Sequence, residues 1–262
     1  IYEHYLPIVA GGDLPGTDEG AIVGIADKMD TIVGFFAVGM PPSGTADPYA
    51  LRRQALGVIN IILSRRYDLS LNFLIDECLA SLKDVLRKPA EDVKKDVLEF
   101  FRGRLQNQLI SQGYAYDTVD AVLAADIDRL VLVIEKIQAL QAFRANPEFE
   151  PLSIAFKRID NILKDFHGGS VDVNLLSQEA EIKLFANFEN IGTRVEKGIA
   201  EKDFTAALNK LAALRSPVDA FFDSVMVMDK DEKIRFNRLS LLADISALFH
   251  QIADFSKIVT AG

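Results

Sequence analysis

The sequence has very little cysteine, and this scarcity excludes several kinds of protein. Cys78 is the one cysteine among 262 residues. A single thiol rules out an internal disulfide framework and a zinc site built from several cysteines. It fits a reducing compartment, and we expect a cytoplasmic protein. Tryptophan is absent, and nine prolines and sixteen glycines are too few for a fibrous or low-complexity chain.

Long hydrophobic runs are also missing. The longest apolar stretch, residues 31–42, reads TIVGFFAVGMPP and ends at two prolines. A helix that crosses a bilayer needs about 20 apolar residues, so we expect no membrane contact. The first residues carry no basic segment followed by an apolar core, so we expect no signal peptide. The chain starts at Ile1 without an initiator methionine, and we expect it to be part of a longer protein.

Positive charge is in deficit. The chain has 29 Lys and Arg against 38 Asp and Glu, which gives a formal net charge of −9. This balance argues against a protein that clamps nucleic acid along its whole surface. It does not exclude a basic surface that is confined to one part of the chain. The length suits one large domain or two smaller ones.

Helical periodicity dominates the sequence that is present. Apolar residues return at spacings of three and four, which is typical of helices that bury one face. The pattern predicts helices over residues 18–39, 50–66, 70–87, 91–112, 118–125, 128–145, 152–166, 178–200, 203–227 and 231–258. Strict alternation of apolar and polar residues is scarce, so we expect an all-α protein. Pro147 and Pro151 bracket a turn, and we place the last domain boundary there.

The usual signatures of enzyme active sites are absent from the sequence. The three histidines, His4, His167 and His250, stand far apart, and none has a second histidine four residues away. We find neither a G-x-S-x-G nucleophile turn nor a glycine-rich phosphate loop. Cys78 lies in the apolar stretch LIDECLASL, where we expect an inert, packed thiol.

Two carboxylates interrupt an apolar helix. Asp27 and Asp30 are three residues apart, so they share roughly one helix face. Such a pair could hold a divalent metal with further ligands. The simpler alternative is a solvated helix edge that pairs with Lys28 or with a neighbouring helix.

Basic residues cluster in places where RNA phosphates could bind. One group lies on the predicted helix after Pro151, and another opens the predicted last helix. The candidates for RNA contact are Lys157, Arg158, Asn161, Lys164, Arg235, Asn237 and Arg238. Phosphate binding requires such groups, but a solvated helix face has the same composition. Arg238 could instead form a structural ion pair with Asp229, Asp231 or Glu232.

Several segments together resemble one protein family. They are HYLP (4–7), DLP (13–15), ADKMDTIVGFF (26–36), DPYALRRQALG (47–57), FFRGRLQNQLISQGYAYDTVDAVLA (100–124), AFKRIDNIL (155–163) and FFDSVMVMDKDEKIRFNRLSLLADISALFHQIADFSKI (221–258). In this order they resemble the beta subunit of bacterial-type glycyl-tRNA synthetase over nearly the full chain. The chain is similar to the C-terminal portion of that subunit.

The resemblance implies a fold and a set of partners. Residues 1–66 would be the end of an HD-like helical domain, 67–146 a helical connecting region, and 147–262 an anticodon-binding helical bundle of the DALR type. The family forms a heterotetramer of two alpha and two beta subunits. The alpha subunit carries the catalytic core for ATP-dependent glycylation, and we expect the whole enzyme to use ATP and Mg²⁺. The beta subunit mainly holds glycine tRNA, so we expect no catalytic residue, cofactor or metal in this chain.

The HD-like part leaves two alternatives to a tRNA-binding role. Asp27 resembles the last metal-binding Asp of HD phosphohydrolases, but the chain contains no His-Asp dipeptide. Without the earlier ligands Asp27 cannot hold a catalytic metal, so a metal-dependent phosphohydrolase is the weaker hypothesis. The other alternative is a purely structural scaffold for assembly. In the main hypothesis the last domain binds the anticodon arm, with cations on phosphates and stacking on bases.

Overall fold

The structure, a computed structural model, describes residues 2–9, 11–164, 166 and 168–260. The chain divides into two compact units. Unit 1 comprises residues 1–114 and 127–134, and unit 2 comprises residues 115–126 and 135–262. The predicted connecting region, 67–146, is shared between these units. The division into three domains therefore stays a prediction.

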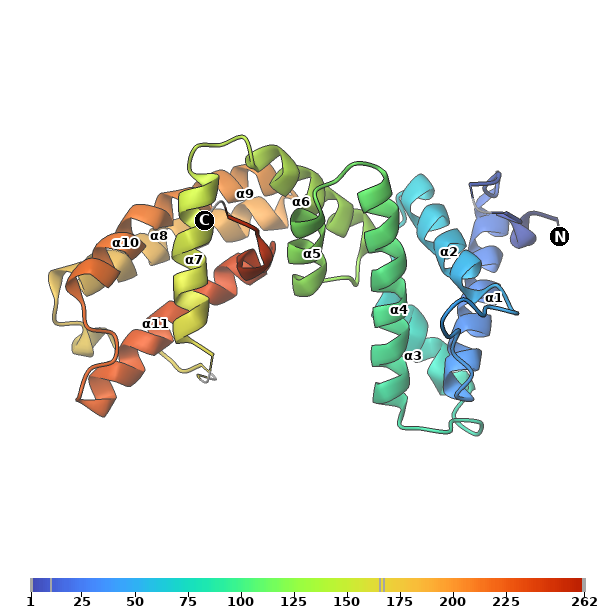
Figure 1. Ribbon diagram of the computed structural model, residues 1–262, viewed down its shortest axis with the longest axis horizontal. Coiled ribbons are helices and arrows are strands. Elements are labelled where there is room, and N and C mark those ends of the chain that lie inside the picture. The colour runs from blue at the N-terminus through green and yellow to red at the C-terminus, as the bar shows by residue number, and fades with distance from the viewer. Residues whose placement is uncertain (1, 10, 165, 167, 261–262) are drawn as a thin grey trace. The chain divides into compact units, whose positions relative to one another are not determined.

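Unit 1 is a bundle of helices preceded by a short 3₁₀ helix, η1 (Tyr2–Tyr5). Its α-helices are α1 (Asp18–Ala37), α2 (Leu51–Arg65), α3 (Leu71–Ser81) and α4 (Ala90–Ser111). Helices α1, α2 and α4 pack against one another, and α3 packs on α1 and α4 (Figure 1).

The core of unit 1 follows from the spacing of its apolar residues. Helix α4 buries a residue at every fourth position: Val93, Val97, Phe101, Leu105 and Leu109. A spacing of four is close to one helical turn, so successive side chains are neighbours in a stripe that winds slowly around α4. Burying a Val, Leu or Phe side chain contributes about 1.5–3 kcal/mol. This stripe anchors the unit.

Asp128 fastens residues 127–134 to the start of α3. Its Oδ1 accepts hydrogen bonds from Ser70 Oγ (2.7 Å) and from the Asn72 backbone N–H (2.8 Å). The Asp128 carbonyl accepts a bond from the Leu71 N–H at 2.9 Å. Burial alone would raise the pKa of Asp128, but these bonds outweigh it and lower the pKa below its usual value.

Unit 2 contains the remaining helices. They are α5 (Tyr116–Ala125), most of α6 (Leu130–Phe143), α7 (Phe149–Ile162), α8 (Glu179–Ala200), α9 (Phe204–Leu211), α10 (Arg215–Ser224) and α11 (Glu232–His250). Unit 2 also contains three short 3₁₀ helices: η2 (Val173–Leu175), η3 (Ala212–Leu214) and η4 (Phe255–Lys257). Helix α7 packs on α10 and α11, and α8 packs on α9, α10 and α11.

The all-α prediction is confirmed, because the residues described contain no β-strand. Most predicted helices match within a few residues. The predicted helix 203–227 is wrong in length, because it is divided into α9, η3 and α10 and ends at Ser224. Pro217 lies in the first turn of α10, where its missing N–H costs nothing. In the middle of a continuous helix the same proline would break a backbone hydrogen bond.

The predicted last helix is also too long, since α11 ends at His250. The backbone N–H of Asp254 bonds to the Ala121 carbonyl of α5 at 2.8 Å. The Asp254 carboxylate accepts the Ser256 N–H at 3.0 Å, a local turn that competes with helix. Ile252 and Phe255 are still buried, so they fill the core from a turn and from η4 rather than from a continuation of α11.

The final residues return to α5. The Val259 N–H donates to Asp117 Oδ2 at 2.9 Å, and Arg144 Nη1 donates to Asp117 Oδ1 at 2.8 Å. Burial would raise the pKa of Asp117, but these bonds and the Arg144 charge hold it below its usual value. Across the part of the chain described, no helix is both long enough and apolar enough to cross a membrane.

Candidate nucleic-acid interface

The first cluster of predicted RNA contacts lies at the C-terminal half of α7. Its buried side chains, Leu152, Phe156 and Ile159 among them, fix which face meets the core. Arg158 and Asn161 are therefore exposed on the opposite face, and the exposed Lys164 follows the end of the helix. Since residues three apart are neighbours on a helix, these three side chains form one polar surface. We call Arg158, Asn161 and Lys164 the α7 surface.

Arg158 stacks on an aromatic ring from another helix. Its guanidinium carbon lies 4.3 Å from the centre of the Phe222 ring on α10, and Nη2 donates to the Phe222 carbonyl at 3.5 Å. Among the residues whose positions are described, no carboxylate lies within 4 Å of Arg158. Stacking fixes the guanidinium plane without neutralising its charge, so the group can still bind a phosphate.

Lys157 lies beside this surface but is half-buried. Its Nζ donates to Thr260 Oγ1 at 3.3 Å, which fastens the end of the described chain to α7. The bond is long and the acceptor is neutral, so the ammonium charge is not paired there. Lys157 adds positive potential at the edge of the α7 surface.

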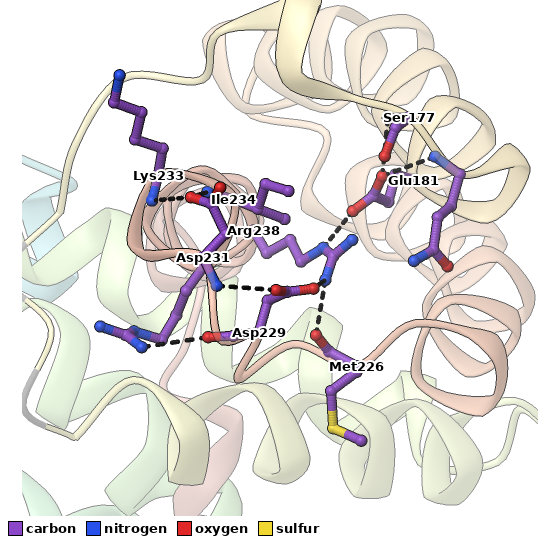
Figure 2. A network of polar contacts seen from close by, with 10 residues as sticks. Ser177, Glu181, Met226, Asp229, Asp231, Lys233, Ile234 and Arg238 are labelled. Carbon is purple, nitrogen blue, oxygen red and sulfur yellow. Dashed lines mark hydrogen bonds and ion pairs between the residues drawn. The ribbon is translucent and has the colours of Figure 1, made fainter.

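The second predicted cluster, at the start of α11, has a different environment. Figure 2 shows Arg238 pointing into the domain, between Glu181 of α8 and the loop that joins α10 to α11. Its Nε donates to Glu181, and Nη1 donates to Asp229 Oδ2 (2.8 Å) and to the Met226 carbonyl (2.7 Å). The side chain is 2% exposed, so it is not available to an RNA phosphate. The alternative role as an ion-pair partner of Asp229 is the one observed.

Glu181 is the buried partner of this arginine. Its side chain is 1% exposed, and it accepts backbone N–H bonds from Ser177 (2.9 Å) and Gln178 (2.8 Å) at the start of α8. Burial would raise the pKa of Glu181, but the Gln178 and Arg238 hydrogen bonds outweigh it and lower the pKa. One carboxylate thus caps α8 and neutralises Arg238.

Asn237 and Arg235 are also used within the protein. Asn237 is 3% exposed; its Oδ1 accepts the Asp172 N–H at 2.7 Å and its Nδ2 donates to the Asp172 carbonyl at 3.1 Å. Arg235 is half-buried, bonds to the Asp229 carbonyl at 3.1 Å, and lies 3.5 Å from Glu232. The prediction that the start of α11 presents Asn237 and Arg238 to RNA is therefore corrected: they hold loops in place.

The structure also answers the questions about Asp27, Asp30 and Cys78. Both carboxylates are exposed on α1, as expected of a solvated helix edge. In the described ranges, no group of three or more His, Cys, Asp or Glu residues could hold a metal ion. Cys78 is half-buried, and burial raises the pKa of its thiol to about 11, which makes the reactive thiolate rare at neutral pH. His167 lies outside the described residues.

The sequence did not reveal two residues that contact the predicted site arginines. Phe222, which orients Arg158, lies 64 positions away in sequence. Glu181, which holds Arg238, lies 57 positions away. A local signal existed only for Glu181: Gln178 followed by an acidic residue three positions later is the spacing of a helix capping box, which the structure contains.

Comparison with known proteins decides the family. Residues 1–124 match the family described as "Glycyl-tRNA synthetase beta subunit", and residues 152–260 match the "DALR anticodon binding domain". The chain is 60% identical over 260 residues, 99% of its length, to the "Glycine--tRNA ligase beta subunit" of Syntrophus aciditrophicus. The proteins of the same name from Geobacter metallireducens and Syntrophotalea carbinolica are 52% and 50% identical over 98% of the chain. The chain belongs to the glycyl-tRNA synthetase beta-subunit family.

The chain spans 38% of the length of each of these three relatives. The family expected from the sequence segments is thus confirmed. The DALR match, residues 152–260, lies within unit 2 and takes in α8 to α11 and all of α7 after its first turn. Both clusters at α7 and α11 therefore belong to the part that matches an anticodon-binding domain.

Proposed function

We propose that this chain is the tRNA-recognition portion of a glycine–tRNA ligase beta subunit. In this proposal unit 2 binds the anticodon arm of glycine tRNA through the α7 surface. The observation that carries the proposal is the exposed Arg158, stacked on Phe222 within the segment that matches an anticodon-binding domain. A stacked guanidinium can contact a phosphate or an unstacked base, which are the usual targets of single-stranded RNA recognition.

The remaining parts of the reaction belong to partners in this proposal. Glycylation takes place with the alpha subunit, which binds ATP and Mg²⁺, in an assembly of two alpha and two beta subunits in the cytoplasm. The chain's own contribution is to bind and orient the tRNA. The phosphohydrolase alternative is not favoured, since Asp27 and Asp30 lie in no cluster of potential metal ligands among the described residues.

The test is the affinity of the intact beta subunit, with its alpha partner, for glycine tRNA. We expect the double variant Arg158→Glu, Lys164→Glu to weaken binding at least tenfold at low salt. Each lost phosphate contact should also lower the slope of log affinity against log salt by about one. Lys210→Glu, a reversal of an exposed charge on α9, is the matched control.

Two other outcomes would point elsewhere. If the double variant kept both its affinity and its salt slope, the α7 surface would not be the contact. If the beta subunit bound its alpha partner normally but bound tRNA equally weakly before and after mutation, the scaffold alternative would replace the proposal.

A further inference from the structure

Unit 1 contains a pocket that the proposed function does not use. It has a volume of about 420 Å³ and lies where η1, α1 and α2 meet. Its polar and aromatic lining comprises Tyr2, Tyr5, Asp27, Lys28, Thr31, Arg53 and Gln54. This volume is within the range of sites that hold small organic molecules.

The wall of the pocket contains a buried lysine. Lys28 is 5% exposed, and its Nζ donates to the His4 carbonyl (2.8 Å) and to the Gly24 carbonyl (3.3 Å). Within the described chain no carboxylate oxygen lies within 4 Å of this ammonium group. Burial lowers the pKa of Lys28, and the Asp27 charge only partly opposes this effect. A buried cation with no anion in contact is costly, and a bound anion would offset that cost.

One helix glycine makes room for this lysine, and another makes room for η1 beside it. A Cβ on Gly57 of α2 would lie 3.3 Å from both Cδ and Cε of Lys28, and a Cβ on Gly24 of α1 would lie 3.1 Å from the His4 carbonyl oxygen. Glycine inside a helix is destabilising relative to alanine. The two helices contain glycine where Lys28 and the His4 carbonyl approach their backbones. The position of its ammonium group is therefore built into the packing of α1 against α2.

Aromatic rings lie beside the cation. Tyr2 and Tyr5 are three residues apart in η1, and in a 3₁₀ helix this spacing places both side chains on one side. They are 66% and 60% exposed, although such rings are ordinarily largely buried. The His4 and Tyr5 ring centres are 3.9 Å apart, which supports the Tyr5 ring from within η1. Exposed rings next to cations are the pattern that binds nucleotides.

We propose that this pocket binds a nucleotide. Lys28 and Arg53 would hold the phosphate, and Tyr2 and Tyr5 would stack on the base. With Asp27 included, the charged side chains that line the pocket sum to one positive charge, which suits an anion. The nucleotide can be a free mononucleotide or one residue of a single-stranded RNA segment, because both offer a phosphate beside a planar base. The site lies in unit 1 and shares no residue with the α7 surface.

The test uses the intact beta subunit with its alpha partner and two probes. One probe is AMP, measured by calorimetry, and the other is a single-stranded RNA of about six nucleotides, measured by fluorescence anisotropy. We expect Arg53→Ala and Tyr5→Ala each to weaken binding about tenfold, and both should affect the same probe. Lys95→Ala, which removes an exposed cation of α4 outside the pocket, should leave binding unchanged.

The two probes distinguish the two sources of the nucleotide. Loss of AMP binding in the pocket variants identifies a mononucleotide site, and loss of RNA binding alone identifies an RNA subsite. If binding of neither probe depends on Arg53 and Tyr5, the inference is overturned, because any AMP binding that remains then belongs to the alpha subunit.

Further variants separate folding from binding and this inference from the proposed function. Lys28→Met keeps the length of the buried side chain without its charge; a folded variant, shown by an unchanged circular dichroism spectrum, must lose probe binding. Arg158→Glu is measured with the same probes and with glycine tRNA. Because it changes only the α7 surface, it should weaken tRNA binding and spare the pocket, so either idea can fail alone.

Discussion

The end of α7 and the start of α11 have the same kinds of side chain but different surroundings. Both carry arginine and asparagine within one turn. On α7 the basic group stacks on a ring and stays exposed, whereas on α11 Arg238 is enclosed by Glu181, Asp229 and a backbone carbonyl. The difference arises from distant partners: α8 places a carboxylate beside Arg238, and α10 places an aromatic ring beside Arg158. Local composition therefore does not distinguish an exposed binding surface from a buried ion-pair network.

The largest expected effect is at Arg238. Arg238→Ala leaves the buried Glu181 carboxylate without its cation, and breaking a buried pair in this way costs about 3–5 kcal/mol. Urea unfolding of the chain, followed by circular dichroism, measures the loss. Lys233→Ala, on the exposed side of the same helix, is the control and should change stability by less than about 0.5 kcal/mol. A small loss of unfolding free energy in Arg238→Ala would mean that the buried ion pair contributes little to stability.

A smaller effect on stability is expected at Glu181, the partner of Arg238 in the buried ion pair, and this effect depends on pH. Because the folded-state pKa of Glu181 is depressed, its contribution is complete above its unfolded pKa and is lost as pH falls through the folded pKa. Glu181→Gln should therefore be less stable near neutral pH by about 1.5–3 kcal/mol, the value of a charged hydrogen bond. Its unfolding free energy should also depend less on pH below about 4.5. Urea unfolding at several pH values measures both, with the exposed Glu196→Gln of α8 as control. Parallel pH curves for Glu181→Gln and the parent chain would contradict the assignment.

The smallest expected effect is at Asn161, between the two cations of the α7 surface. Asn161→Ala removes a hydrogen-bonding group but no charge, so tRNA affinity should fall only about threefold. The salt slope should stay the same, unlike that of the charge-reversal variant. Anisotropy titrations of tRNA at several salt concentrations distinguish the two. A changed slope would show that Asn161 acts through the position of its charged neighbours.

The sequence predicted the helices well where the signal was local. The apolar stripe of α4 and the caps of α8 lie within one element, so their periodicity and spacing are visible in the sequence. The division of the predicted helix 203–227 was missed because apolar periodicity continues across η3, where α9 gives way to α10. Ile252 and Phe255 keep the helical spacing although α11 ends before them, because burial also selects apolar residues in turns and 3₁₀ helices.

The candidate site was only partly predictable for a related reason. The exposure of Arg158 and Lys164 can be predicted from the apolar face of α7, since burial of one face exposes the other. The burial of Asn237 and Arg238 does not follow, because it depends on Asp172 and Glu181, residues far away in the sequence. Lys28 is similar: the sequence places it between two aspartates on a helix edge, and only the packing of α2 shows that it is buried.

The bond between Val259 and Asp117 has a consequence for synthesis of the protein. The two residues are 142 positions apart, and the Asp254 contact with Ala121 spans a similar distance. Chains emerge from the ribosome at about 5–20 residues per second, and contacts between distant residues form only after both ends are available. Helix α5 is therefore made several seconds before residues 254–259, with which it forms these bonds. The hydrogen bonds that join α5 to this segment therefore form only after residues 254–259 have been made.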